Sequence, residues 1–305
     1  MKANNLACPI DAQSLVLHDR QLRCVNGHCF DLARQDYVNL LPVQHKRSKY
    51  PGDSKEMVAA RHRFLNTGTY EPVADTLSAL LLKAIGDIER GADGCVPVDF
   101  RSPCCLDAGC GEGYYLDYAL KYLRARQDHS TPHFDPDFIG LDISKEAIVA
   151  AAKRNKDITW VVGTNRQPPI VAGSVDIILC VFGFHSFQGF NNILPVGGKL
   201  LLVEPGPDHL QELRQVTYPQ LHKTALNNLD DAFATGFKQV GEQNLHFNTP
   251  ALPNESLKDL LLMTPHFFRA TQKGREAAEK LDDVSLTVDI TFRSLEKTED
   301  YDATA

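Results

Sequence analysis

The sequence predicts an α/β fold with a doubly wound parallel sheet, preceded by a small module that contains cysteine and histidine. From Cys104 onward, apolar runs of strand length alternate with amphipathic runs of helix length, as in βαβ units. Three glycines follow the first of these apolar runs, just before a predicted helix. Residues 6–30 instead hold cysteines and histidines close together. These observations separate a large domain from a small N-terminal one.

Length and composition agree with this organisation. The 305 residues suffice for one large domain and a smaller module, and 43% hydrophobic residues are typical of a globular protein. We expect a cytoplasmic protein without a membrane span, because no apolar run has the necessary length and the N-terminus has no apolar signal segment. The eight cysteines are irregularly spaced and do not form a disulfide framework.

Charge is distributed unevenly along the chain. The net charge is −7, but residues 1–70 hold 10 Lys/Arg and 6 Asp/Glu, so they carry +4 and the remainder carries −11. A polyanionic partner would therefore contact the N-terminal part. The alternative is a basic face that is merely solvated.

The N-terminal stretch LACPIDAQSLVLHDRQLRCVNGHCF resembles a metal-binding module in which one ligand is exchanged. Cys8 is followed three positions later by Asp11, and Cys24 is followed four positions later by His28. Cys29 or His18 could replace a missing ligand, although we expect Cys29 to point into the core of the module. The segment FDLARQDYVNLLP then supplies apolar residues for that core, namely Phe30, Tyr37, Leu40 and Leu41.

A basic linker and two helices connect the module to the large domain. Ser54 or Asp53 is a suitable N-cap for a helix that ends before Gly68, and a second helix is predicted over 71–85. We expect a module at 1–42, the linker and helices at 43–86, the large domain at 87–295 and a disordered acidic tail at 296–305.

The large domain contains five predicted strands and four predicted helices in alternation. The strands are CCLDAG, DFIGLDI, ITWVVG, VDIILCVF and KLLLVE. The helices cover 114–126, 145–155, 187–194 and 209–217. The last third adds a helix at ESLKDLLLMTP and an alternating strand at VSLTVDITFRSLEK, which we expect to pair antiparallel at the edge of the sheet.

The run CCLDAGCGEGYYLDYAL is the most informative for chemistry. Gly109, Gly111 and Gly113 let the backbone approach a ligand, and the helix that follows offers unpaired N–H groups. A dinucleotide fingerprint would need glycine where Tyr114 stands, which disfavours an NAD-dependent oxidoreductase. The observed spacing after Asp107 resembles the first motif of class I S-adenosylmethionine-dependent methyltransferases.

Three later segments agree with that resemblance. Asp142 ends the second strand, where its carboxylate can bind two ribose hydroxyls or act as a helix N-cap partner. VDIILCVFG and LPVGGKLLLVEPGP follow at suitable intervals. Asn165, after the third strand, is either an adenine contact or a turn residue.

Nearly the whole chain resembles the bacterial 23S rRNA guanine-N1 methyltransferases of the RlmA type, in the form typical of the Gram-negative branch. The resemblance rests on FDLARQDYVNLLPVQHKRSKYPGDSKEM, LDAGCGEGYY, PGPDHLQEL and LLLMTPHFFRA. It implies a zinc-ribbon-like module joined to a class I methyltransferase domain. It also implies methylation of N1 of one guanine in a 23S rRNA hairpin, and a homodimer.

The resemblance further implies ligands. The family binds zinc with three cysteines and one histidine. Here Cys8, Cys24 and His28 occupy three of these positions and Asp11 the fourth, which zinc accepts with weakened affinity. Cofactor contacts carry over to Tyr70, Gly111, Glu112 and His209, and together with the motif residues the expected set is Tyr70, Asp107, Gly109, Gly111, Glu112, Gly113, Asp142, Asn165 and His209.

The chemistry needs positioning more than covalent participation. S-adenosylmethionine carries an activated methyl group, and a general base would assist loss of the N1 proton. His209, Glu204 and Asp107 are candidates for that base. The target guanine must be unpaired or extruded, and Phe182, Phe184 and Phe187 form either a stacking surface for it or part of the core.

RNA binding is assigned to the basic N-terminal part. The predicted phosphate contacts are His45, Lys46, Arg47, Lys49, Arg61 and Arg63. Two alternatives remain: a methyltransferase acting on a small molecule, which the acidic large domain would suit, and a catalytically silent RNA- or ribosome-binding protein. The N-terminal module disfavours the first, and the intact glycine motif disfavours the second.

Overall fold

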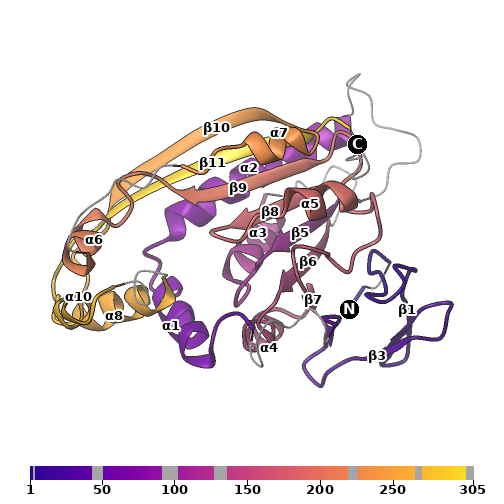
Figure 1. Ribbon diagram of the computed structural model, residues 1–305, viewed down its shortest axis with the longest axis horizontal. Helices are drawn as coiled ribbons and strands as arrows, with labels where there is room; N and C mark the ends of the chain where they lie inside the picture. Colours follow the sequence, from indigo (N-terminus) through magenta and orange to yellow (C-terminus); the bar gives the residue numbers. More distant parts are fainter. Residues whose placement is uncertain are drawn as a thin grey trace.

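The structure, a computed structural model, is an α/β domain with a small β module at its N-terminus (Figure 1). It describes residues 1–2, 4–42, 51–90, 102–126, 136–218, 226–264 and 270–299. The described part holds no helix that is both long enough and apolar enough to cross a membrane.

One eight-stranded sheet forms the centre, in the order β10-β11-β9-β8-β5-β6-β7-β4. Six strands are parallel, and β11 and β10 add antiparallel pairs at one edge. The parallel strands are β4 (Tyr37–Asn39), β5 (Cys104–Ala108), β6 (Asp137–Asp142), β7 (Thr159–Val162), β8 (Ile177–Val181) and β9 (Lys199–Pro205). The antiparallel strands are β10 (Phe237–Asn248) and β11 (Thr287–Lys297).

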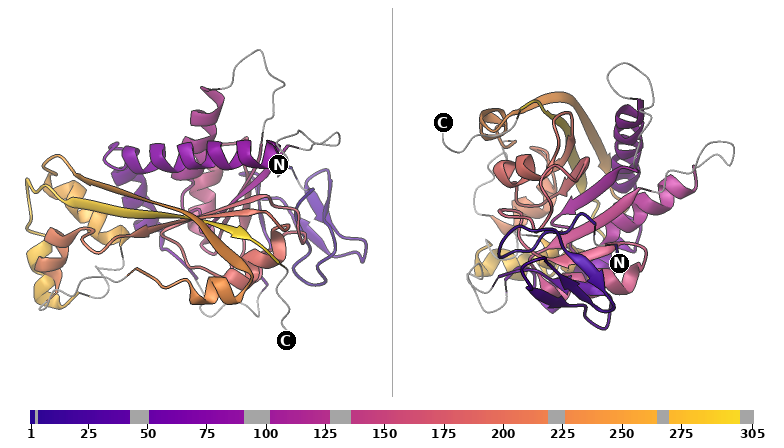
Figure 2. Two further views of the ribbon diagram at one scale, coloured as in Figure 1. Left: turned by 90° about the horizontal axis from the view of Figure 1, so that it is seen from above. Right: turned by 90° about the vertical axis from the view of Figure 1, so that its right-hand side faces the viewer.

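Helices cover both faces of the sheet. On one face, α2 packs against α3 and α3 against α4, while α1 packs against α8 beyond the strand ends (Figures 1 and 2). These helices are α1 (Lys55–Leu65), α2 (Glu71–Arg90), α3 (Tyr114–Arg124), α4 (Lys145–Arg154) and α8 (Asn254–Met263). The short helices elsewhere are α5 (Phe187–Ile193), α6 (Gln211–Thr217), α7 (Asp230–Ala234) and α10 (Gln272–Ala278). Each apolar strand is thus buried from both sides.

The N-terminal module carries its own three-stranded antiparallel sheet of β1 (Val16–His18), β2 (Gln21–Arg23) and β3 (Cys29–Asp31). It lies against the same face as α5, because Leu6, Leu15 and Leu22 are buried in one cluster with Ile170 and Phe190. The module is therefore attached to the large domain through an apolar contact.

Most predicted elements are confirmed, including the five parallel strands of the large domain and the helix capped by Ser54, whose Oγ accepts from the Met57 N–H. Two expectations need correction. Tyr37 and Leu41 pack into the core of the large domain rather than of the module, because β4 joins the central sheet beside β7. Strand β10 is also new: eight of its twelve residues are not apolar, so no strand pattern was visible in the sequence.

Two predicted boundaries are wrong. Helix α2 extends to Arg90, so a boundary at 86 falls inside it; the single Gly86 costs only about 1 kcal/mol of helix propensity and does not end the helix. Residues 296–299 do not belong to a disordered tail. Glu296 forms ion pairs with Lys199 and Lys238, and the Thr298 N–H donates to the Gly236 carbonyl. The remaining tail, 300–305, lies outside the described residues.

Candidate active site and metal centre

A cavity of about 420 Å³ opens where the carboxyl ends of β5, β6 and β8 meet. This is the switch point of the sheet, because the chain leaves β5 toward β6 on one side and reaches β8 on the other. Of the nine residues expected to contact a cofactor, six line this cavity: Asp107, Gly109, Gly111, Glu112, Asp142 and Asn165.

Asp107 is a buried carboxylate without a matching donor. Its side chain is 1% exposed, and Oδ1 has no hydrogen-bond partner among the described residues. Burial, with a smaller contribution from the charge of Asp142, raises the pKa of Asp107 to about 8. A cationic group entering the cavity would supply the missing partner. S-adenosylmethionine carries both an ammonium and a sulfonium, so the site fits this cofactor.

Asp142 holds the glycine loop in place. Its Oδ2 accepts from the Gly111 N–H at 2.9 Å, and its Oδ1 accepts from the Ser144 N–H at 2.8 Å. Burial raises the pKa of this carboxyl group. The loop and the end of β6 are therefore linked at the place where a nucleoside would lie, and the predicted contact of Asp142 with ribose hydroxyls stays a prediction.

Gly113 has a packing role that the motif did not reveal. It has φ +82° and is not among the residues that line the cavity. A Cβ at this position would lie 2.6 Å from the Trp160 ring and 3.0 Å from the Ala151 Cβ. Glycine is required here for a left-handed conformation and for close packing of α3, so direct contact of Gly113 with a cofactor is not supported.

The Glu112 carboxylate faces an arginine rather than open space. Glu112 is 1% exposed, and its Oε2 accepts from Arg154 Nη2 at 2.6 Å and from Nε at 3.0 Å. His62 Nδ1 lies 2.8 Å from the same oxygen. The backbone of Glu112 still belongs to the glycine loop, but its side chain ties this loop to α1 and α4.

Asn165 connects two loops at the rim of the cavity. Its Nδ2 donates to the carbonyl oxygens of Ala108 and Phe184, at 3.2 and 3.0 Å. The amide nitrogen therefore has a structural role in a turn. Contact of this residue with adenine stays a prediction.

A second cavity, of about 600 Å³, adjoins the first. Five residues line both cavities: Asp53, Arg61, Phe182, Gly183 and Met263. Tyr70 and His209 line only the second cavity, where the Tyr70 hydroxyl lies 3.4 Å from His209 Nε2. His209 Nδ1 accepts from the Asp289 N–H at 3.3 Å, and burial raises the pKa of Tyr70. Tyr70 and His209, both predicted to contact the cofactor, therefore lie in the second cavity and are separated from the first by the residues that line both.

Glu204 also lines the second cavity, within a polar cluster that sequence reasoning missed. Its carboxylate accepts from Asn227 Nδ2 at 2.6 Å and from Arg293 Nη1 at 3.1 Å. His185 Nδ1 lies 4.0 Å from Glu204 Oε1. The sequence did contain a signal: Asp289, Thr291 and Arg293 alternate with the apolar residues Val288, Ile290 and Phe292, which places polar groups on one buried face of the strand.

Two of the three candidate stacking aromatics are exposed. The exposed fractions of Phe182 and Phe184 are 41% and 59%, and both line the first cavity. The guanidinium of Arg166 lies 5.1 Å from the centre of the Phe184 ring. Phe187 instead packs against Phe237. The exposed rings could stack with a base, whereas Phe187 belongs to the core.

The basic residues expected to bind RNA divide into three groups. Arg61 faces inward, where it forms an ion pair with Asp53 and lines both cavities, so its contact with an RNA phosphate stays a prediction. Arg63 is exposed but is paired with Asp259 at 2.5 and 2.8 Å. The others, His45, Lys46, Arg47 and Lys49, lie outside the described residues.

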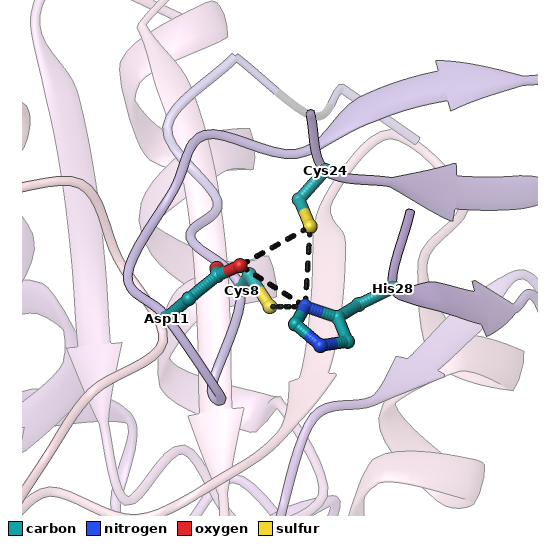
Figure 3. A group of neighbouring side chains, drawn as sticks. All are labelled: Cys8, Asp11, Cys24 and His28. Carbon is teal, nitrogen blue, oxygen red and sulfur yellow. Dashed lines mark hydrogen bonds and ion pairs between the residues drawn. The ribbon is translucent and has the colours of Figure 1, made fainter. Parts of the chain in front are cut away.

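The four predicted metal ligands converge in the N-terminal module (Figure 3). Their ligand atoms all lie within 4.8 Å of one another. His28 Nδ1 lies 3.5 Å from Cys8 Sγ, 3.3 Å from Cys24 Sγ and 3.0 Å from Asp11 Oδ2. Zinc bonded to sulfur at about 2.3 Å and to nitrogen or oxygen at about 2.0–2.2 Å has tetrahedral edges of roughly 3.3–3.8 Å. The donor set therefore fits a zinc ion.

Neither alternative ligand belongs to this cluster. Cys29 is exposed, and its Sγ lies 3.3 Å from the Gly27 carbonyl, so the expectation that it points into the core of the module is wrong. His18 lies at the end of β1 and is exposed. Asn26 Nδ2 instead donates to Asp11 Oδ2 at 2.9 Å, which orients the carboxylate toward the other ligands.

We expect the purified protein to hold one equivalent of zinc through this cluster. Asp11→Ala should lower zinc affinity at least about 100-fold, because it leaves three protein ligands, whereas Asp11→Cys should bind zinc more tightly than the wild type. Metal content after dialysis against a chelator of graded strength measures this. Cys29→Ala is the matched control and should leave affinity unchanged. Zinc retained equally by Asp11→Ala and the wild type would contradict the assignment.

Both the N-terminal module and the large domain match known protein families. Residues 6–49 match the family model described as RlmA, N-terminal, a zinc ribbon, and residues 105–194 match a methyltransferase domain. A Streptomyces fradiae protein named 23S rRNA (guanine(748)-N(1))-methyltransferase is 32% identical over 94% of this chain and 95% of its own. The YxjB protein of Bacillus subtilis (strain 168) is 27% identical over 93% of this chain and 94% of its own.

Among solved structures, the YcgJ protein from Bacillus subtilis matches 66% of this chain and 94% of its own, with 17% identity and a TM-score of 0.41.

Proposed function

The chain belongs to the family of 23S rRNA (guanine-N1)-methyltransferases of the RlmA type, and from this premise we propose that it methylates N1 of one guanine in a hairpin of 23S rRNA. The observation that carries the proposal is the pair of adjoining cavities. One is suited to a cationic nucleoside cofactor, and the other presents polar groups at the shared wall. The zinc-ribbon module adds a second surface for RNA.

S-adenosylmethionine supplies a methyl group on a sulfonium, which a ring nitrogen can attack without another cofactor. We assign its binding to Asp107, Asp142 and the glycine loop, with Asn165 at the rim. The tasks of the protein are to align the two reactants and to exclude water from the reaction. Arg61, Phe182 and Met263 lie at the shared wall, where the cofactor and the base would meet.

The RNA would approach from the side that carries the exposed aromatics. N1 of guanine lies on the Watson–Crick edge, so the base must leave any helix before it reacts. Phe184 beside Arg166 offers a planar surface on which a neighbouring base could stack. The proposed phosphate contacts are His45, Lys46, Arg47, Lys49, Arg61 and Arg63. We place the enzyme in the cytoplasm, where ribosomes are.

The homodimer and the assignment to the Gram-negative branch stay predictions. Light scattering on the purified chain measures the mass directly. A mass of 33.9 kDa would contradict the dimer.

The proposed activity is tested with 23S rRNA that lacks the modification. We expect transfer of labelled methyl from S-adenosylmethionine and a single new reverse-transcription stop, because a methyl group on N1 blocks Watson–Crick pairing. RNA that has already been methylated is the control and should accept no label. Label that enters RNA without a stop would contradict methylation of N1. Cofactor binding without any transfer to RNA would instead favour a small-molecule substrate or a silent RNA-binding protein.

A further inference from the structure

Glu204 is positioned to face a base in the second cavity. It lies near the end of β9, beside the wall that this cavity shares with the cofactor cavity, and it is 2% exposed. Two donors fix its orientation: Asn227 Nδ2 at Oε1 and Arg293 Nη1 at Oε2. Arg293 Nη1 also donates to the Asn227 carbonyl at 2.6 Å, so the three residues form one connected group.

This group matches the Watson–Crick edge of guanine. That edge presents two neighbouring donors, N1–H and the N2 amino group, next to the O6 acceptor. Each carboxylate oxygen has two acceptor sites, and one donor from the protein at each oxygen leaves one site at each for the base. Adenine presents an unprotonated N1, which a carboxylate would repel. The chemistry of the cluster therefore favours guanine.

The other candidates for a general base are less suitable. Both ring nitrogens of His209 are engaged, by Tyr70 and by the Asp289 N–H. Asp107 lines the first cavity only, and its Oδ1 has no hydrogen-bond partner among the described residues. His185 also lines the second cavity, and burial lowers its pKa. Its Nδ1 lies 4.0 Å from Glu204 Oε1, beyond hydrogen-bond distance, so this carboxylate does not orient its ring as a general base. Glu204 lines the second cavity only, and two donors hold its carboxylate in place.

We propose that Glu204 binds the Watson–Crick edge of the target guanine and accepts its N1 proton, with Arg293 and Asn227 as positioning residues. This inference rests on the proposed function. The N1–C bond forms as the methyl–sulfur bond breaks and leaves its electron pair on sulfur. The N1 proton passes to Glu204 Oε1 or Oε2 and from there to solvent after product release.

The first test compares Glu204→Gln with the wild type in single-turnover methylation of a 23S rRNA fragment. We expect the rate at pH 7 to fall about 100- to 1000-fold, the range for loss of a general base. The wild-type rate should change little between pH 7 and 9. The variant should gain about tenfold per pH unit, because N1 must then lose its proton to solvent. A structural defect would lower the rate without creating this pH dependence.

The second test uses the same RNA with inosine at the target position. Inosine lacks the N2 amino group, so the wild type should methylate it about 10- to 100-fold more slowly than guanosine. Glu204→Gln should lose most of that preference. Glu296→Gln, which removes another ion-paired carboxylate on this sheet, is the matched control and should behave like the wild type.

The outcomes separate this inference from the proposed function. In a calorimetric titration, Glu204→Gln should bind S-adenosylmethionine with the wild-type affinity. Such binding would show that the variant is folded. If Glu204→Gln binds no cofactor, Glu204→Asp takes its place; it should be slow but should keep the wild-type pH profile. A wild type that leaves 23S rRNA unmethylated overturns the proposed function. A wild type that methylates it while Glu204→Gln stays within threefold at pH 7 overturns the role of Glu204 alone.

Discussion

Replacing Asp107 with asparagine is expected to weaken S-adenosylmethionine binding by about 100-fold and, at the same time, to stabilise the cofactor-free protein. Asparagine keeps the shape of the side chain but removes the charge that a cationic ligand would neutralise, and loss of one partner of a buried charge pair costs about 2–5 kcal/mol. Isothermal titration calorimetry measures the first effect, and urea denaturation measures the second.

The stability effect has a defined dependence on pH. The folded-state pKa of Asp107, about 8, lies above the usual value of 3.8, so the folded protein binds a proton there that the unfolded chain has lost. Wild-type stability therefore decreases between these pH values, by up to about 1.4 kcal/mol per pH unit from this group. Asp107→Asn has no titrating group at this position. The free energy of unfolding of the variant should therefore exceed that of the wild type by an amount that grows from pH 5 to pH 7. An advantage that is constant with pH would contradict a raised pKa.

Cofactor binding should show the same linkage. At pH 7 most of the free wild-type protein carries the Asp107 proton, and a bound cation lowers the pKa, so binding should release close to one proton. Titrations in two buffers with different ionisation enthalpies measure this number. Asp107→Asn should release none from this site. Affinity of the wild type should rise with pH between 6 and 7.5, by at most tenfold per unit.

Replacing Arg154 with methionine is expected to destabilise the protein by about 3–5 kcal/mol, because the Glu112 carboxylate would keep its burial and lose its main partner. The Arg154 side chain is only 13% exposed, so water does not readily take over its role. We also expect weaker cofactor binding, since this ion pair connects the glycine loop to α4. Urea denaturation of the cofactor-free protein measures the change.

A double variant isolates the electrostatic part of that loss. Glu112→Gln combined with Arg154→Met removes both charges and should recover most of the lost stability. Lys121→Met is the matched control, since Lys121 is 71% exposed in its pair with Asp117 and should matter by less than about 1 kcal/mol. If the double variant is as unstable as Arg154→Met alone, packing rather than charge explains the effect.

Local patterns were sufficient for much of the large domain. The five parallel strands are continuous apolar runs because both faces of the sheet are covered, and such runs are visible without a structure. The glycine loop was equally visible, since positive φ at Gly109, Gly111 and Gly113 restricts those positions to glycine. The set of metal ligands was also predictable, because Cys8 with Asp11, and Cys24 with His28, lie close together in sequence.

The remaining features depend on contacts between distant segments. Strand β4 joins the sheet beside β7, more than 100 residues later, and β10 exists because β11 pairs with it along its whole length. Arg61 was predicted only as a phosphate contact, because a basic residue in a helix carries no sign of the cavity behind it.

Local sequence alone thus predicted the five parallel strands of the large domain, the glycine turn and the candidate metal ligands, because each depends on residues that are near neighbours in the chain. Only the tertiary structure decided that Glu204, Asn227 and Arg293 meet in one buried group. The placement of Arg293 beside Glu204 follows from the antiparallel register of β11 on β9, in which Thr291 faces Glu204. Strand register depends on which face of each strand is buried and on how the strands are connected, and it is decided only when the distant strands pair.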